Sequence, residues 1–223
     1  MELQALTETG EIATLTVDEM GFPIDMPEEI KAAIIDLNTG RITYPEYQRI
    51  SYMVIKRMRM PELLNYVAGE EWEKFVDLTL ACFEVMPEAF TFYDRLPDNL
   101  KYNFAIDAYT HHGDSIPAVR QAVRTARRYG KPDLPPEIAA AETITIYRAG
   151  EEPIDKAKYR ISWTTDYDVA AFFFGEYIHR HANHIYKGTI RTADIIAYVD
   201  DREEKEVMQY RKVFDISDIT PDE

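Results

Sequence analysis

The sequence predicts an α+β protein in which helices occupy the first part of the chain and strands the last third. Between residues 27 and 142, apolar residues recur at steps of three and four, as in an amphipathic helix. From residue 143 they alternate with polar residues, as in a half-buried strand. The proline-rich segment YGKPDLPPEIAAAE separates the two patterns. We therefore expect a mainly helical region of unknown role over residues 1–140 and a second domain over residues 141–223.

Two helices follow directly from the pattern in the first region. The segment TYPEYQRISYMVIKRM, residues 43–58, opens with a capping box of Thr43 and Glu46. Its apolar side chains fall on one face, which contains Tyr47, Ile50, Val54 and Met58. The segment EEWEKFVDLTLACF, residues 70–83, has a similar face of Trp72, Phe75, Val76, Leu80 and Phe83. We expect an amphipathic helix in each segment.

In the second domain, four segments alternate as strands do. They are residues 143–148, 184–190, 194–199 and 206–214. The stretch ISWTTDYDVAAFFFG, residues 161–175, predicts a short strand around Trp163 that ends abruptly and leads into a helix. Enzymes often present polar side chains into a cleft at such a strand end, so Ser162 and Thr164 are candidates for a functional site.

The composition limits the partners of the protein. Its 223 residues include 25 basic and 40 acidic side chains, which gives a formal net charge of −15. This charge disfavours attraction to nucleic acid and to anionic membranes, so we expect neither as a partner. The single cysteine, Cys82, excludes an internal disulfide, and no apolar run reaches the roughly 18 residues that span a bilayer. Because the first residues also lack a secretory signal pattern, we expect a soluble, cytoplasmic protein.

Three segments of the second domain carry side chains suited to chemistry, and the first is the end of the strand over residues 143–148. Arg148 stands there, followed by Ala149 and Gly150. Arginine makes bidentate contacts to phosphates, and glycine lets a ligand approach the backbone closely. The alternative interpretation of Arg148 is an ordinary solvated or salt-bridged side chain.

The second segment is Ser162-Trp163-Thr164. Side chains alternate along a strand, so Trp163 is expected to point away from the two hydroxyls and into the core. Hydroxyl and carboxylate side chains before a helix usually cap it, and Thr165 or Asp166 is placed to do so. Capping leaves Ser162 without an explanation.

The third segment is REEKEVM, in which one residue separates Glu204 from Glu206. Residues two apart in a strand point to the same face, so both carboxylates are expected to enter one site. A charged surface loop is the alternative interpretation.

In this order and spacing, the three segments resemble the catalytic domain of an ADP-ribosyltransferase of the arginine–serine–glutamate (R-S-ExE) type. The resemblance runs from Tyr147 to about Val213 and includes the helix DVAAFFF and the segment IIAYVDDREEKEVM. It departs from the family pattern at Trp163, where a small or hydroxyl residue is often found. The resemblance implies a split β-sandwich that binds NAD between its sheets as a substrate and needs no metal. It also suggests a bacteriophage or bacterial effector, acting in the cytoplasm of a bacterial or infected host cell.

The resemblance assigns catalytic roles to four residues. Glu206 would stabilise the positive charge that develops on the ribose as its bond to nicotinamide breaks. Ser162 would hold Glu206 in place, and Arg148 would clamp the phosphate or ribose end of NAD. Glu204 would hydrogen-bond the incoming guanidinium of an arginine acceptor.

The same resemblance implies further contacts to NAD. Thr164 would support the strand that carries Ser162. The backbone of Ala149 or Gly150 would hold the amide of nicotinamide. One of three aromatic side chains would stack on the nicotinamide ring, namely Phe172, Phe173 or Phe174.

We therefore expect a mono-ADP-ribosyltransferase that transfers ADP-ribose from NAD to an arginine of a target protein. One alternative keeps the enzyme class but changes the outcome to NAD hydrolysis or to modification of a nucleic acid or small molecule. Another is a catalytically silent interaction or structural protein that uses its helical half. The joint presence of Arg148, Ser162, Glu204 and Glu206 favours an active enzyme.

Two further clusters carry less weight. His179, His181 and His184 lack a closing cysteine or carboxylate at a recognised metal spacing, so we interpret them as surface residues. A basic stripe on the helix AVRQAVRTARRYGK contains Arg120, Arg124, Arg127 and Lys131. It is interpreted as a solvated face and, in so acidic a protein, as a candidate to dock an acidic partner or to cover the adenosine phosphates.

Overall fold

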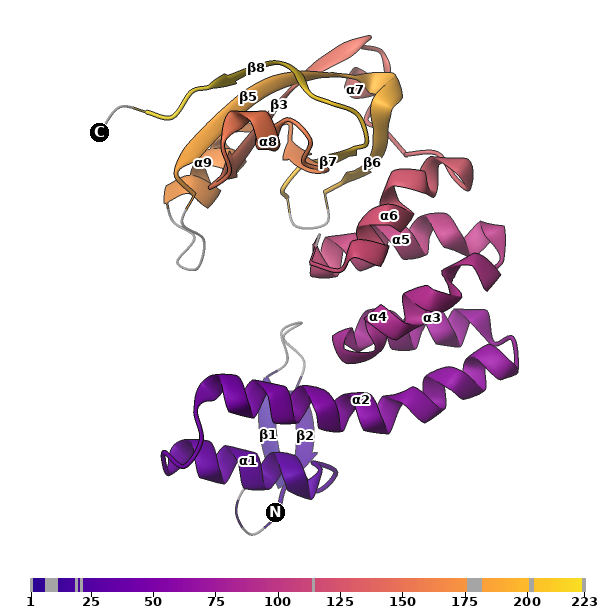
Figure 1. The fold of residues 1–223 in the computed structure, drawn as a ribbon, viewed down its shortest axis with the longest axis vertical. Coiled ribbons are helices and arrows are strands. Elements are labelled where there is room, and N and C mark those ends of the chain that lie inside the picture. Colours follow the sequence, from indigo (N-terminus) through magenta and orange to yellow (C-terminus); the bar gives the residue numbers. More distant parts are fainter. Residues whose placement is uncertain are drawn as a thin grey trace. The chain divides into compact units, whose positions relative to one another are not determined.

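The computed structural model describes residues 2–6, 12–18, 20, 22–113, 115–175, 182–200 and 203–221. The chain forms two compact units, Met1–Phe92 and Tyr93–Glu223 (Figure 1). Helices dominate the first unit, and the second combines helices with a six-stranded antiparallel sheet, so the predicted α+β class is confirmed. The units divide before the sequence pattern changes near residue 140, because the helices over residues 98–125 group with the sheet.

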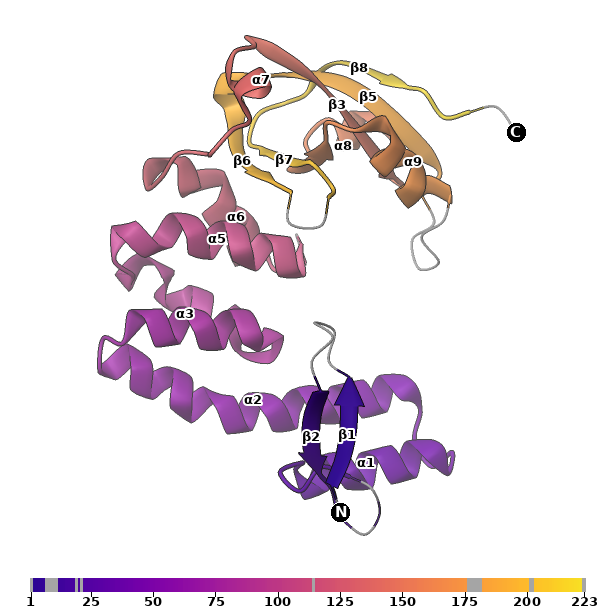
Figure 2. The ribbon, with the colours of Figure 1, turned by 180° about the vertical axis from the view of Figure 1, so that it is seen from behind.

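The first unit begins with a β-hairpin that the sequence pattern did not predict. β1 (Glu2–Leu6) pairs antiparallel with β2 (Ile12–Thr16), and Figure 2 shows the two strands side by side. The helices that follow are α1 (Glu28–Asn38), α2 (Tyr44–Ala68), α3 (Trp72–Ala81) and α4 (Met86–Ala89). The 3-10 turns η1 (Phe83–Val85) and η2 (Phe90–Arg95) flank α4.

The helix α2 begins where the sequence predicts it. The backbone N–H and the hydroxyl of Thr43 both donate to Oε2 of Glu46, each over 2.8 Å, so the predicted capping interaction is present. The helix continues through Pro61 to Ala68, beyond the predicted segment. Neither α2 nor any other helix among the described residues is long and apolar enough to cross a membrane.

The core of the first unit lies between α2, α3 and the turns after α3. Its most buried side chains are Leu63, Val67, Phe75, Val85, Met86 and Ala89. The ring of Phe75 meets Trp72 and Phe92 edge to face, at centroid distances of 5.9 and 6.5 Å. Both predicted segments form helices, but their predicted apolar faces are only partly buried. Val54 and Phe75 are buried, whereas Met58 is 52% exposed and Phe83, 39% exposed, lies beyond the end of α3.

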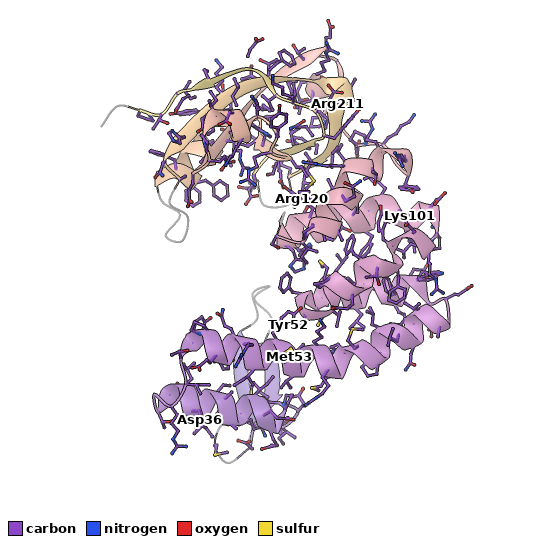
Figure 3. All side chains as sticks on the ribbon, in the orientation of Figure 1. Asp36, Tyr52, Met53, Lys101, Arg120 and Arg211 are labelled. Atoms are coloured by element: carbon purple, nitrogen blue, oxygen red, sulfur yellow. The ribbon has the colours of Figure 1, made fainter. Side chains whose placement is uncertain are left out.

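The second unit opens with two packed helices, α5 (Asp98–His112) and α6 (Pro117–Thr125). They bury Phe104, Ala105, Ala108, Val119 and Val123. Lys101 of α5, labelled in Figure 3, is buried beside them. Its Nζ lies 2.9 Å from Asp98 Oδ1 and 4.8 Å from the ring centre of Tyr129, so the buried charge has both an anion and a π-face as partners.

These helices are joined to the sheet by hydrogen bonds to one strand, β6 (Ile195–Val199). The hydroxyl of Tyr102 on α5 donates to the carbonyl of Ile196 over 2.7 Å. The guanidinium of Arg127, in the 3-10 turn η3 (Ala126–Arg128), donates to the carbonyl of Ile195. The helical segment over residues 98–128 is thus part of the same unit as the strands.

The sheet has the strand order β6-β7-β4-β3-β5-β8, with every pair antiparallel. The other strands are β3 (Thr143–Gly150), β4 (Ser162–Thr164), β5 (His184–Arg191), β7 (Glu206–Gln209) and β8 (Phe214–Asp218). The short helices α7 (Pro136–Ala139), α8 (Ile154–Ala157) and α9 (Tyr167–Gly175) lie before and between strands, with the 3-10 turn η4 (Thr192–Asp194) before β6. The predicted strands near 143, 184 and 194 and the helix after Trp163 are confirmed.

The predicted single strand over residues 206–214 is wrong, because the chain turns between β7 and β8. The turn carries Val213, whose backbone N–H donates to the carbonyl of Lys158 over 2.9 Å and whose side chain is fully buried. A Cβ at Gly188 would lie 2.3 Å from Cγ1 of Val213, so the bare backbone of Gly188 gives Val213 its place. Burial of Val213 therefore outweighs continuation of the strand.

Trp163 is the largest side chain in the core of the sheet, as its alternation with Ser162 and Thr164 predicts. It is 2% exposed, and it lies with Ile146, Tyr186, Ile190 and Val207 in one apolar cluster. Its indole Nε1 donates to the carbonyl of Arg160 over 3.0 Å, so the ring is buried without losing its hydrogen bond.

Candidate active site

A cavity of about 910 Å³ lies within the second unit. Its walls come from the end of β3, from β4, from α9, from the turn before β7 and from the last turn of α5. The residues that the sequence singled out and that border the cavity are Arg148, Ala149, Gly150, Ser162, Trp163, Thr164, Phe173, Glu204 and Glu206. Side chains from four separate segments are thus brought to one place.

The cavity lies where the sheet is narrowest. β3 pairs with β5 over eight residues, from Thr143 to Gly150. Between β3 and β4, by contrast, the described strands share one residue pair, Tyr147 with Thr164. The sheet therefore consists of two three-stranded halves, β6-β7-β4 and β3-β5-β8, with a short connection beside the cavity.

Arg148 is held at this connection by two acceptors. Its Nη1 donates to the carbonyl of Ser162 over 2.8 Å, and its Nε donates to Oε1 of Glu152 over 3.1 Å. The side chain is 23% exposed and borders the cavity. Arg148 is therefore salt-bridged, as the alternative interpretation had it, and is also presented to the cavity.

Glu152 is a residue that the sequence analysis missed. Its side chain is 11% exposed, and Oε1 accepts from Arg148 and also from Nε of Arg160, over 2.8 Å. Burial raises the pKa of Glu152, but Arg148, a hydrogen bond to the backbone of Glu152 itself and Arg160 together outweigh burial and hold that pKa below its ordinary value. A glutamate in the run Glu151-Glu152 gives no local signal, because its partners lie on other elements.

The role of Gly150 is clearer in the structure than in the sequence. A Cβ at this position would lie 2.7 Å from Oε2 of Glu152. The missing side chain therefore makes room for the Glu152 carboxylate beside the cavity, whereas the sequence suggested room for a ligand.

The register of β4 defines the neighbours of the two hydroxyls. Ser162 stands opposite Met208 of β7, and Thr164 stands opposite Glu206. The hydroxyl of Thr164 donates to the carbonyl of Glu204 over 2.8 Å and accepts from the N–H of Asp166 over 3.0 Å. Thr164 is therefore the cross-strand neighbour of Glu206, and the support of Glu206 by Ser162 stays a prediction.

The helix α9 forms one wall of the cavity. Asp166 caps it, because Oδ1 accepts from the N–H of Asp168 over 2.9 Å, as the capping interpretation predicts. Phe173 borders the cavity, together with Val169 and Ala170 on the same face of the helix. Phe172 and Phe174 are not among the residues that border it, and Phe172 is 47% exposed. Of the three phenylalanines, Phe173 is the one placed to meet a ligand.

Glu204 and Glu206 both border the cavity, but not for the predicted reason. β7 begins at Glu206, so Glu204 lies in the preceding turn and not on the strand. Glu203 and Lys205 have φ values of 58° and 45°, a left-handed conformation that is uncommon for residues other than glycine. The turn, and not the two-residue repeat of a strand, brings the two carboxylates to one site. Glu206 is 8% exposed.

Two contacts of Lys205 fix this turn. The backbone N–H of Lys205 donates to Oδ1 of Asp200 over 2.9 Å, and its Nζ lies 2.7 Å from Oδ2 of Asp166. The hydrogen bond from Lys205 is the main cause that lowers the pKa of Asp166 below its ordinary value. The turn before β7 is thereby attached to Asp166, which caps α9.

The last turn of α5 is a wall of the cavity that the sequence did not predict. Residues 109–113, including His111 and His112, border it. Nδ1 of His111 lies 2.7 Å from the carbonyl of Asp107, so this ring is oriented by its own helix. The local sequence gave no signal, because α5 reaches the cavity through long-range packing within the unit.

The histidine cluster and the basic stripe noted in the sequence are only partly described by the structure. His179 and His181 lie outside the described residues, and Nδ1 of His184 lies 2.7 Å from Oδ2 of Asp218. Within the described ranges, no three histidine, cysteine or acidic side chains are grouped so that they could hold a metal ion. Of the basic stripe, Arg127 binds the carbonyl of Ile195, so at least this member has a structural role.

No family model matches the sequence, and the chain matches no curated protein and no solved structure. What can be inferred about function therefore depends on the geometry and chemistry of the cavity.

Proposed function

We propose that the second unit is an ADP-ribosyltransferase domain that transfers ADP-ribose from NAD to an arginine of a target protein. The observation that carries the proposal is the convergence of Arg148, Ser162, Glu204 and Glu206 on one cavity. These residues were selected from the sequence by their chemistry, their order and the resemblance to the ADP-ribosyltransferase family, before the structure brought them together. Their convergence is what that reaction requires and is not what solvated surface residues would produce.

The reaction needs a carboxylate beside the ribose. As the bond from ribose C1′ to the nicotinamide nitrogen breaks, nicotinamide leaves with the electron pair and the sugar becomes positively charged. Glu206 stabilises this charge, and its burial strengthens the effect because few water molecules screen it. The acceptor guanidinium then attacks C1′ and gives up a proton, which Glu204 takes or passes to water.

The arrangement of charges along β4 supports one orientation of NAD. Arg148 meets β4 at the carbonyl of Ser162, whereas Glu206 stands opposite Thr164. The diphosphate therefore lies toward Ser162 and the nicotinamide ribose toward Thr164, with Phe173 placed to stack on the nicotinamide ring. The six strands form one sheet, and the short pairing between β3 and β4 is the feature that supports a split β-sandwich as part of this proposal.

The proposal is tested with the purified full chain and NAD labelled in its adenylate half. Label is expected to transfer to proteins of a cell lysate and to a small guanidino compound, and Glu206→Gln is expected to abolish both transfers. Glu203→Gln, an exposed acid in the same turn, is the matched control and is expected to keep full activity. Release of free ADP-ribose without transfer would instead indicate an NAD hydrolase, and label on nucleic acid a different acceptor. No turnover under any condition would support a silent interaction protein.

A further inference from the structure

The helix α6 and the turn after it are basic in an otherwise acidic chain. Residues 115–132 contain five basic side chains and no acidic one, whereas the whole chain has 25 basic and 40 acidic side chains. One of the five, Arg127, donates to the carbonyl of Ile195. The other four, which we call the basic face, are Arg120, Arg124, Arg128 and Lys131.

The basic face has no acidic partner among the residues that the structure describes. No ion pair, side-chain hydrogen bond or ring contact involves any of its four side chains there. Three of the four are exposed, and Arg120, labelled in Figure 3, is half-buried. Elsewhere in the same unit, Lys101, Arg148 and Lys205 each have a carboxylate oxygen within 3.1 Å. The positive charges of the basic face therefore stay available to an external anion.

The helix dipole explains only part of this arrangement. Arg124 lies in the last turn of α6, where a positive charge is favourable. Arg120 lies near the start of α6, at the positive end of the dipole, and the first turn contains no acidic residue to offset it. The two arginines are also four residues apart, so their like charges repel each other on the helix. Arg120 thus breaks two local rules, which is typical of a residue kept for function.

We propose that the basic face binds an acidic segment of a partner protein. Burial of Val119, Ala122 and Val123 fixes which side of α6 packs against the unit. Arg120 and Arg124 are then about 6 Å apart along the helix axis, which matches the spacing of two carboxylates four residues apart on a facing helix. Guanidinium groups bind carboxylates by paired hydrogen bonds, so an arginine-rich face suits aspartate and glutamate side chains.

The net charge of the chain separates this occupant from other anions. Nucleic acid carries phosphates along its whole length, and beyond the basic face it would meet a chain of net charge −15. A second copy of the chain carries the same net charge and is repelled. A protein segment needs only a local group of carboxylates. That this partner is the protein modified by the transferase is the one part that rests on the proposed function.

The test is fluorescence anisotropy of a labelled helical peptide with glutamate at every fourth position, compared with the same peptide carrying glutamine there. The full chain is expected to bind the glutamate peptide at least about tenfold more tightly at low ionic strength, and added salt should reduce the difference. Arg120→Gln combined with Arg124→Gln is expected to weaken this binding about tenfold. Since arginine and glutamine have similar helix propensities, the double variant should melt no lower than wild type.

The matched control combines Arg191→Gln with Arg211→Gln. Both are exposed arginines of the same unit, so the net charge changes equally, but both lie outside α6. The control is expected to bind the glutamate peptide within about twofold of wild type. None of the four substituted arginines is among the residues that border the cavity, so transfer of ADP-ribose to a small guanidino compound should be unchanged in both variants.

The outcomes separate this inference from the proposed function. Equal peptide affinity in the double variant and the control overturns it, as does a wild type that does not distinguish the two peptides. Tighter binding of a DNA duplex at the same ionic strength assigns the face to nucleic acid, and self-association lost in the double variant assigns it to a second copy; either result overturns the proposal. Selective binding of the glutamate peptide by a chain that does not turn over NAD supports the basic face and refutes the transferase.

Discussion

Glu152 shows how one residue can set both the charge and the geometry of a site. It is mostly buried, it holds Arg148 and Arg160 through one oxygen, and Gly150 leaves space for its other oxygen. Since its pKa is lowered in the folded state, the ionised form is the one that the fold stabilises. Glu152 should therefore contribute to the stability of the fold.

The sign of its pH dependence follows from the direction of the pKa shift. A carboxyl whose folded pKa lies below its unfolded value contributes stability above the unfolded pKa, and that contribution is lost as the pH falls through the folded pKa. Glu152→Gln is therefore expected to lower the free energy of unfolding most near pH 7, and the difference from wild type should shrink as the pH falls below about 4.5. Urea unfolding from pH 7 to pH 3 measures this. Glu151→Gln, on an exposed neighbour, is the control and should change stability by less than about 0.5 kcal/mol at pH 7. A Glu152→Gln difference that stays constant over this range would contradict the interpretation.

At the residue scale, the roles of Glu204 and Glu206 can be tested separately, because the two residues differ in backbone conformation. Glu206 belongs to β7, whereas Glu204 lies in the turn between two residues of positive φ. If Glu204 serves the acceptor, Glu204→Gln should lose transfer to arginine at least about tenfold while NAD hydrolysis continues. The two rates are measured on the same sample with labelled NAD, with Glu203→Gln as control. Equal loss of both rates would mean that the two carboxylates act as one unit.

At the scale of elements, β4 connects the core to the cavity. Trp163 and Val207 face the core, while Ser162 and Thr164 stand opposite Met208 and Glu206. A short strand can do this because successive side chains point to opposite faces. The same three residues therefore determine stability on one face and the surroundings of Glu206 on the other.

Substitutions in β4 should separate these two functions. Trp163→Ala removes a fully buried indole and its hydrogen bond to Arg160, and is expected to destabilise the fold by about 3 to 5 kcal/mol. Ser162→Ala keeps the backbone carbonyl that accepts the hydrogen bond from Arg148, so it should lower the free energy of unfolding by at most about 1 kcal/mol. Chemical unfolding of both variants provides the comparison. A stable Trp163→Ala variant and an unstable Ser162→Ala variant would contradict the assignment of faces.

Local patterns explain which elements could be predicted from the sequence. The capping box at Thr43, the alternation in β3 and the abrupt end of β4 are properties of neighbouring residues, and each appears where predicted. The break between β7 and β8 could not be read in this way, since it depends on the packing of Val213 over Gly188. Arg160, Glu152 and the last turn of α5 were missed for the same reason, because their contacts join distant segments.

At the scale of the whole molecule, the important division is the one between the two compact units. The helices α5 and α6 look like part of a helical region in the sequence, yet they group with the sheet. Tyr102 and Arg127 bind carbonyls of β6, and the last turn of α5 supplies a wall of the cavity. A fragment that contains the whole cavity should therefore begin before α5 and not at the first strand of the sheet.

Two fragments of the chain test this division. A fragment over residues 93–223 contains every described residue that borders the cavity, so it is expected to unfold cooperatively and to bind ADP with an affinity within about threefold of the full chain. A fragment over residues 141–223 lacks α5, α6 and η3, which removes the partners of β6 and one cavity wall. Because Ile195 and Ile196 are fully buried in the complete unit, this shorter fragment is expected to expose apolar surface, to bind a hydrophobic dye and to show no cooperative thermal transition. Cooperative unfolding and full ADP affinity in the shorter fragment would show that the helices α5 and α6 are dispensable. Failure of the longer fragment to fold would mean that the two units depend on each other for stability.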